Sequence, residues 1–212
     1  MVLAIFGGAL SISSVEDLIY PALFVIAGFI AILSHEMGHA LVGRRLGGGQ
    51  QTIVLELFGG LTSSHGMQLT RGGRALMILA GPMMTLLLGI ISLWLTWNIV
   101  APVMASHNLD FWDLAISPFT AALISPKLYI LSCLIMIGEW WTLLNLLPIY
   151  PLDGGQLIAQ YIRSPRKVFM TGFITAILIG LLSFQLFHGY FIPIFMALFA
   201  YSNYREYKNA PF

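Results

Sequence analysis

Charged residues are scarce in this sequence. Its 212 residues include only 10 Lys and Arg and 9 Asp and Glu, whereas 58% are hydrophobic. A soluble domain carries about 25% charged residues, so this composition excludes that class and predicts a protein that crosses a membrane several times. The net charge is +1 and no basic cluster with interleaved aromatic residues occurs, which argues against nucleic acid as a partner.

Cysteine is almost absent as well. The single Cys133 lies in an apolar run and has no second cysteine with which to form an internal disulfide. We therefore expect it to pack in the core rather than to carry chemistry. No proline- or serine-rich linker divides the chain, so we expect one integral membrane domain over residues 1–212, with a core at about 15–160 and C-terminal spans at about 168–202.

What the chain does contain is a series of long apolar runs. They predict a mainly α fold, a polytopic membrane helical bundle of about 4–6 spans. After Gly47–Gly49, the β-forming residues of Gln51–Thr62 predict a small strand or hairpin inserted behind the first core helix, and Gln156–Arg163 is expected to form a short helix. The expected spans begin near Leu18 and then cover Ala75–Val100, Lys127–Leu147 and Val168–Phe187, with Phe191–Tyr201 as a short fifth span or a re-entrant helix.

The first apolar run contains a His-Glu-x-x-His motif at His35–His39. Positions i and i+4 share one face of a helix, so His35 and His39 can present two imidazole nitrogens to one metal ion. Glu36 lies beside them and can take a proton from a metal-bound water. This pattern predicts a zinc site with one Zn²⁺ per chain and the chemistry of a metallohydrolase.

A chance match to so short a motif is the alternative. However, each ionisable side chain at the centre of a membrane helix costs about 2.5 to 3.5 kcal/mol, which favours a functional reason for three of them within five residues. A soluble zinc protease is a poor fit, because its motif helix would have a polar outer face that this one lacks.

Two histidines need a further ligand from the protein. Asp153 fits best by its expected depth in the membrane, although an ordinary Asp-Gly turn would have the same sequence. Glu56 is expected to point to water from the strand region. His65 is a possible ligand, but a lone histidine in a loop rich in serine and glycine is more often solvated.

Glu139 is a second acid within a predicted span. It could relay protons or form a hydrogen bond between helices, and we favour the packing role.

Basic residues predict the orientation of the chain. If the N-terminus is outside, alternating spans place nearly all Lys and Arg on the cytosolic side and leave only Lys127 outside. The active site is then expected toward the cytosolic side, where the zinc helix and the Asp153 segment can meet.

Two motifs together resemble the site-2 protease family of intramembrane zinc metalloproteases. His35–His39 is similar to the first motif of that family, and Asn145–Pro148 with Pro151–Gly155 is similar to the second. The resemblance implies that His35, His39 and Asp153 bind zinc and that Glu36 activates water. It also implies that Asn145 holds the substrate or the oxyanion. The chain departs from the family at Thr85, four residues after Gly81, where many members have Asn or another small residue.

The function implied is cleavage of a transmembrane helix of another membrane protein near its cytosolic end, with the lipid bilayer as surroundings. A catalytically silent relative that binds membrane helices is the main alternative. A metal carrier is a third, which we consider weak because a tight three-ligand site releases metal poorly.

A helical substrate must be drawn into an extended form before its peptide bond can be attacked. The segment Ile53–Leu61 is rich in β-formers and includes Phe58, Gly59 and Gly60, where missing side chains would let another backbone approach. We expect the substrate to add as a strand to this edge. The alternative is a hairpin that only plugs the cytosolic mouth of the bundle.

Overall fold

The computed structural model describes residues 18–56, 59–66, 68–107 and 111–211. Phe58, one of the predicted substrate contacts, lies outside these residues, as does the N-terminal segment on which the predicted orientation depends. The described residues fold as two compact units. The first unit comprises those within Met1–Gln68 and Ala80–Thr142, and the second comprises those within Leu69–Leu79 and Leu143–Phe212.

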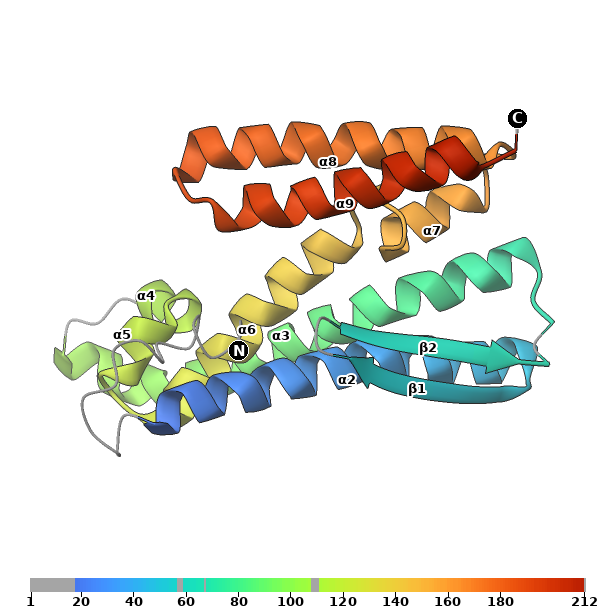
Figure 1. Ribbon diagram of the computed structural model, residues 1–212. Coiled ribbons are helices and arrows are strands. Elements are labelled where there is room, and N and C mark those ends of the chain that lie inside the picture. The colour runs from blue at the N-terminus through green and yellow to red at the C-terminus, as the bar shows by residue number, and fades with distance from the viewer. Residues whose placement is uncertain (1–17, 57–58, 67, 108–110, 212) are drawn as a thin grey trace. The chain divides into compact units, whose positions relative to one another are not determined.

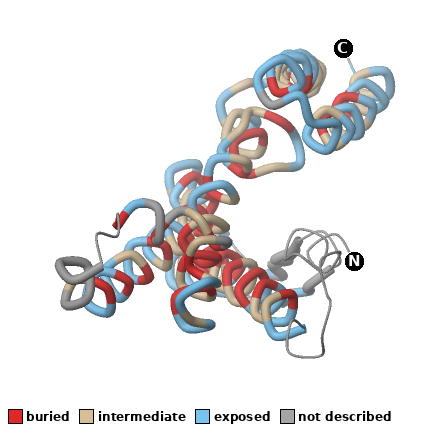
Figure 2. The backbone as a smooth tube through the Cα atoms, turned by 90° about the vertical axis from the view of Figure 1, so that its left-hand side faces the viewer, coloured by how far each residue is buried: buried red, intermediate tan, exposed pale blue. Residues whose placement is uncertain are grey.

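Four helices in the described part of the chain are long and apolar enough to cross a membrane. This confirms a mainly helical, multi-pass membrane protein with a span count inside the predicted range. Figure 2 shows that buried and exposed positions alternate along these helices, as expected where lipid takes the place of water around the outer faces. The four are α2 (Ile19–Gly47), α3 (Arg71–His107), α6 (Pro126–Asn145) and α8 (Pro165–Phe187).

The bounds of these helices follow local signals. Gly48, which follows the last residue of α2, has a positive φ of 66°, a value that glycine adopts without strain. Helix α6 ends at Asn145, two residues before the predicted end, because Pro148 disfavours helical geometry in the residue before it. Helix α8 begins at Pro165 rather than Val168, since proline fits the first helical position.

A β-hairpin follows α2 and contacts it (Figure 1). Its strands β1 (Gln50–Glu56) and β2 (Gly59–His65) are antiparallel, with Gln50 opposite His65 and Glu56 opposite Gly59. Of the two predicted alternatives, a strand or a hairpin, the hairpin is therefore observed. Gly59 and Gly60 begin the second strand instead of ending the first, and His65 ends that strand instead of lying in a loop.

The first unit has its core between α2 and α6. Phe24 and Ala27 of α2 pack with Tyr129, Cys133 and Leu134 of α6. Cys133 is buried and free, which confirms that it packs in the core. Two short helices, α4 (Phe111–Ile116) and α5 (Pro118–Ala122), lie between α3 and α6 in the sequence.

The second unit is organised around α8 and α9 (Phe191–Asn209), which pack side by side (Figure 1). Helix α9 extends beyond the predicted Phe191–Tyr201. The polar residues after Tyr201 continue it to Asn209. Ile149, Ala176, Met196 and Ala200 form the buried core of this unit. The short helix α7 (Asp153–Ala159) begins three residues before the predicted start at Gln156.

Candidate metal centre

The two histidines of the motif lie one turn apart on α2 and point to the same place. The Nε2 atoms of His35 and His39 are 3.1 Å apart. Two nitrogen ligands at about 2.0 to 2.1 Å from a tetrahedral zinc would be separated by about 3.3 Å, so the observed spacing suits one shared metal. The side chains are only 3% and 8% exposed, respectively, which shields the position from bulk water.

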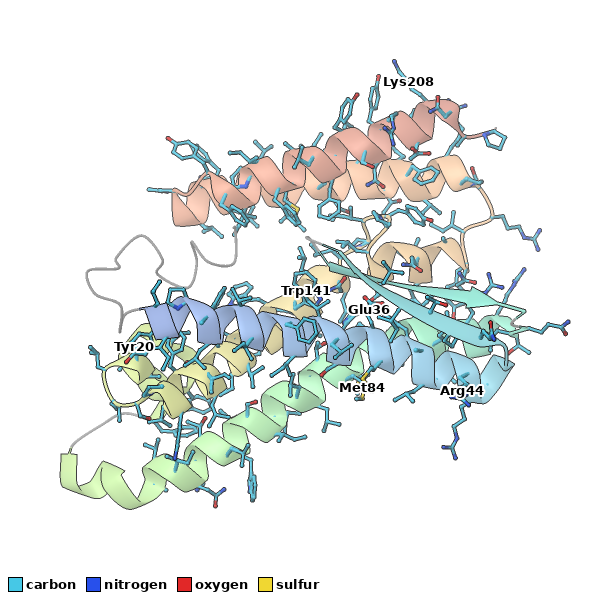
Figure 3. The ribbon with its side chains drawn as sticks, turned by 60° about the horizontal axis from the view of Figure 1, so that its bottom comes forward. Tyr20, Glu36, Arg44, Met84, Trp141 and Lys208 are labelled. Atoms are coloured by element: carbon cyan, nitrogen blue, oxygen red, sulfur yellow. The ribbon has the colours of Figure 1, made fainter. Side chains whose placement is uncertain are left out.

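Glu36 is buried beside this pair and comes from the same turn of α2 (Figure 3). A carboxylate in the middle of an apolar membrane helix has a high free-energy cost, so such residues usually have a functional role. The metal-binding candidates His35 and His39 are at the two ends of the motif that contains Glu36. One helix therefore supplies two imidazole nitrogens and a carboxylate to the same small region.

Helix α3 provides the space that a metal needs. A Cβ placed on Gly81 would overlap the imidazole of His39 and lie 2.8 Å from Nε2 of His35. The missing side chain therefore leaves a cradle directly in front of both nitrogens, and any larger residue would fill it. A small ion with a preference for imidazole nitrogen, such as Zn²⁺, fits this cradle.

A second glycine brings the two helices together. A Cβ on Gly38 would overlap the carbonyl of Ala80 and lie 2.8 Å from Cγ of Met84, which Figure 3 labels on α3. The sequence alone did not indicate that Gly81 faces the histidines. A glycine beside proline in a span was the available signal.

Hydrogen bonds one turn beyond Gly81 tie α3 to α6. Thr85 Oγ1 donates to the Pro82 carbonyl at 3.0 Å and lies 2.9 Å from Thr142 Oγ1. Thr142 also donates to Pro82 at 3.3 Å. Thr85 is completely buried, so its role is to join the two helices behind the candidate metal position.

Asp153 belongs to the second unit. It is the first residue of α7 and only 5% exposed. Gly154 and Gly155 let the backbone fold back on itself, because a Cβ on either would overlap main-chain atoms of Leu146 and Leu147 or of Ile149. His35, His39 and Asp153 are all buried, and each offers one ligand atom suited to zinc.

The remaining predicted residues have different positions. Asn145 is buried at the last residue of α6. Glu56 and His65 are the last residues of β1 and β2. Glu139 is exposed on α6, and within the described residues it makes no hydrogen bond or ion pair, so the predicted hydrogen bond between helices is not formed there.

Comparison with known proteins identifies a family and several relatives with similar sequences. Residues 23–187 match the model of peptidase family M50. Zinc metalloprotease MJ0392 of Methanocaldococcus jannaschii is 27% identical over 203 residues, 91% of this chain and 51% of that protein. Putative zinc metalloprotease Rip3 of Mycobacterium tuberculosis is 31% identical over 132 residues, 62% of this chain and 29% of that protein. The chain thus spans about half or less of the length of these relatives.

A solved structure has the same fold. The site-2 protease from Methanocaldococcus jannaschii superimposes with a TM-score of 0.60 over 97% of this chain and 85% of that one, at 23% sequence identity.

Proposed function

Because the chain belongs to peptidase family M50, the family of the site-2 proteases, we propose that it is an intramembrane zinc metalloprotease that cleaves transmembrane helices of membrane proteins near the cytosolic side. The observation that carries this proposal is the buried histidine pair, with Nε2 atoms 3.1 Å apart, in a helix of membrane length. The Gly81 cradle in front of the pair supports it.

Zinc is the cofactor that the family and the names of the relatives imply. We propose His35, His39 and Asp153 as its ligands, which leaves one tetrahedral position open. An ion held by these three ligands would lower the pKa of a water coordinated at the open position to about 7 and polarise the scissile carbonyl. Two imidazoles and one carboxylate are a ligand set found in catalytic zinc sites.

Glu36 is the proposed general base and acid. Its carboxylate would accept a proton from the attacking water as the new C–O bond forms, and it would return the proton to the amide nitrogen as the C–N bond breaks. Its burial beside the histidines supports this role, because few water molecules compete for its oxygens. Asn145 would donate hydrogen bonds from its side-chain amide to the substrate backbone or to the developing oxyanion.

We propose that the substrate pairs as an extended strand with the free edge of the hairpin, near Phe58, Gly59 and Gly60. In a sheet of only two strands, each strand has one edge without a strand partner among the described residues. Backbone groups released when the substrate helix unwinds could pair along such an edge. Two glycines at the start of β2 would let the substrate backbone come close.

A cleavage assay with defined metal content tests the function. Purified protein reconstituted in vesicles with a model transmembrane substrate, tagged at both ends, should cut it within the apolar segment near the cytosolic end. Treatment with a zinc chelator should abolish cleavage, and added Zn²⁺ should restore it with about one zinc per chain, as a single site requires. A cut near the opposite end would refute the proposed side.

Cleavage that persists after complete metal removal would refute the zinc mechanism. If the zinc-loaded protein bound the substrate helix without cutting any substrate, the silent, helix-binding relative would be the better description.

The strand proposal is tested by adding a side chain at the glycine pair. Gly60→Val retains a β-forming residue but blocks close approach of another backbone, so kcat/KM should fall about 10- to 100-fold, as expected when a substrate is displaced by about 1 Å. Zinc content should not change. Ser64→Val, on the same face of β2 four residues later, is the matched control and should cleave normally. Equal cleavage by the two variants would mean that the hairpin does not hold the substrate there.

A further inference from the structure

The turn that leads into Asp153 is held by a residue from the C-terminal helix. Asn203 of α9 is 1% exposed, and its Nδ2 donates hydrogen bonds to the Tyr150 carbonyl at 2.6 Å and to the Phe199 carbonyl at 2.9 Å. The bond to Phe199 lies within α9. The bond to Tyr150 joins α9 to a segment 53 residues earlier in the chain.

The same turn is enclosed by glycines. A Cβ on Gly172 of α8 would overlap Oδ1 of Asn203 and lie 3.3 Å from the Tyr150 nitrogen. A Cβ on Gly155 of α7 would lie 2.5 Å from the same nitrogen. The backbone of Tyr150 is thus in close contact with α7, α8 and Asn203, which leaves it little freedom to move.

A polar amide at this position needs a reason. The surrounding core of Ile149, Ala176, Met196 and Ala200 is apolar, and an apolar residue would pack there without the cost of burying an amide. Among the described residues, Oδ1 of Asn203 has no hydrogen-bond partner, which adds to that cost. The bond to the Tyr150 carbonyl is the interaction that sets Asn203 apart from an ordinary core residue.

From Tyr150 the constraint passes to Asp153 through the backbone. The Leu152 nitrogen donates to the Ile149 carbonyl at 2.8 Å, and the Gln156 nitrogen donates to the Leu152 carbonyl at 2.9 Å. These bonds connect the turn to the first turn of α7, where Asp153 is the first residue. A shift of Tyr150 would therefore change the direction of the Asp153 side chain.

We propose that Asn203 is a positioning residue for the metal site, which holds the Asp153 turn at the orientation in which its carboxylate can bind zinc. The inference rests on the proposed function, because it takes Asp153 as the third ligand. Residue 203 lies beyond the part of the chain that matches the family model, residues 23–187. The packing of α8 against α9 then also determines the orientation of the proposed zinc ligand Asp153.

The test compares Asn203→Leu, which keeps the branching of the side-chain heavy atoms but removes the donor, with Ser183→Ala. Ser183 is a matched control because it is also buried and because, among the described residues, its hydroxyl bonds only within α8, to the Gly180 carbonyl at 2.9 Å. Asn203→Leu should accelerate hydrogen exchange of the amides in residues 146–156 and weaken zinc affinity about 10- to 100-fold, the range typical of residues that orient metal ligands. It should also alter the visible absorption spectrum of the Co²⁺-loaded protein. Ser183→Ala should change none of these.

Three further variants separate this inference from the ligand assignment itself. Asp153→Ala should lose more zinc affinity than Asn203→Leu, whereas His65→Ala and Glu56→Ala should retain it. Unchanged zinc affinity in Asp153→Ala would refute the proposed ligand set, and the positioning role with it. If Asp153→Ala loses zinc but Asn203→Leu keeps the wild-type affinity and Co²⁺ spectrum, only the positioning role is wrong. Unchanged hydrogen exchange in Asn203→Leu would likewise refute it.

Discussion

Replacing Glu36 by glutamine should lower the rate of substrate cleavage by about 100- to 10,000-fold while the protein keeps its zinc. The amide has nearly the same shape as the carboxylate but cannot accept a proton from water, so the variant loses the general base and little else. Zinc content measured by elemental analysis should stay near one per chain, since Glu36 is not a proposed ligand. The rate constant should fall under single-turnover conditions with bound substrate.

Glu139→Gln is the matched control for this experiment. Glu139 is also an acid within a membrane-length helix, but it is exposed on α6 and is not part of the proposed site. Its replacement should leave cleavage within about twofold of the wild type, a range typical of surface substitutions of about 0.5 kcal/mol or less. Normal turnover by Glu36→Gln would contradict the proposed mechanism, and a comparable loss in Glu139→Gln would favour a proton relay through that residue.

Replacing Gly81 by alanine should remove zinc from the protein. The added methyl group would occupy the cradle in front of His35 and His39, so either the imidazoles rotate away or α3 shifts from α2. Both outcomes separate the two nitrogens from a shared metal position, and we expect zinc affinity to fall by at least about 100-fold, the upper end of what disturbed ligand orientation costs. Titration with a competing zinc chelator measures the effect without any substrate.

Gly89→Ala provides the control in the same helix. Outside its own helix backbone, a Cβ on Gly89 would have one neighbour within 4 Å among the described residues, the Ile135 carbonyl at 3.9 Å, which is ordinary contact. This variant should bind zinc normally, and alanine should favour the helix slightly. Thermal unfolding of both variants would show whether Gly81→Ala loses zinc in a folded protein. Wild-type zinc affinity in folded Gly81→Ala would show that the metal does not bind in the cradle.

Local patterns were sufficient to predict much of this protein from its sequence. Membrane spans depend on the length and composition of single segments, so α2, α6 and α8 could be predicted to within a few residues, whereas α3 begins four residues before and ends seven residues after the predicted Ala75–Val100. The pairing of His35 with His39 is equally local, since helical periodicity alone places them on one face. The two motifs together also identified the family, because each is a short, contiguous run.

The errors in the prediction share a physical cause, which is that each feature depends on contacts with residues outside its own segment. Helix α7 was placed too late because glycines at 154 and 155 usually interrupt helices, whereas here close backbone packing requires them. Gly59 and Gly60 were placed at the end of a strand, yet the pairing partner across the hairpin puts them at the start of β2. The exposure of Glu139 could not be predicted from the composition of its own helix, because exposure depends on which neighbouring elements cover that face.

By itself the sequence determined the membrane setting, the face of α2 that carries His35 and His39, and the acid beside them, because these follow from composition and spacing within one segment. Only the tertiary structure revealed that Gly81 lies in front of the histidines, that Thr85 joins α3 to α6 and that Asn203 holds the peptide of Tyr150. Each of these contacts joins residues more than 40 positions apart, and which of many small or polar residues meet depends on how whole helices pack. Contacts of this kind leave no periodic signal in a single sequence.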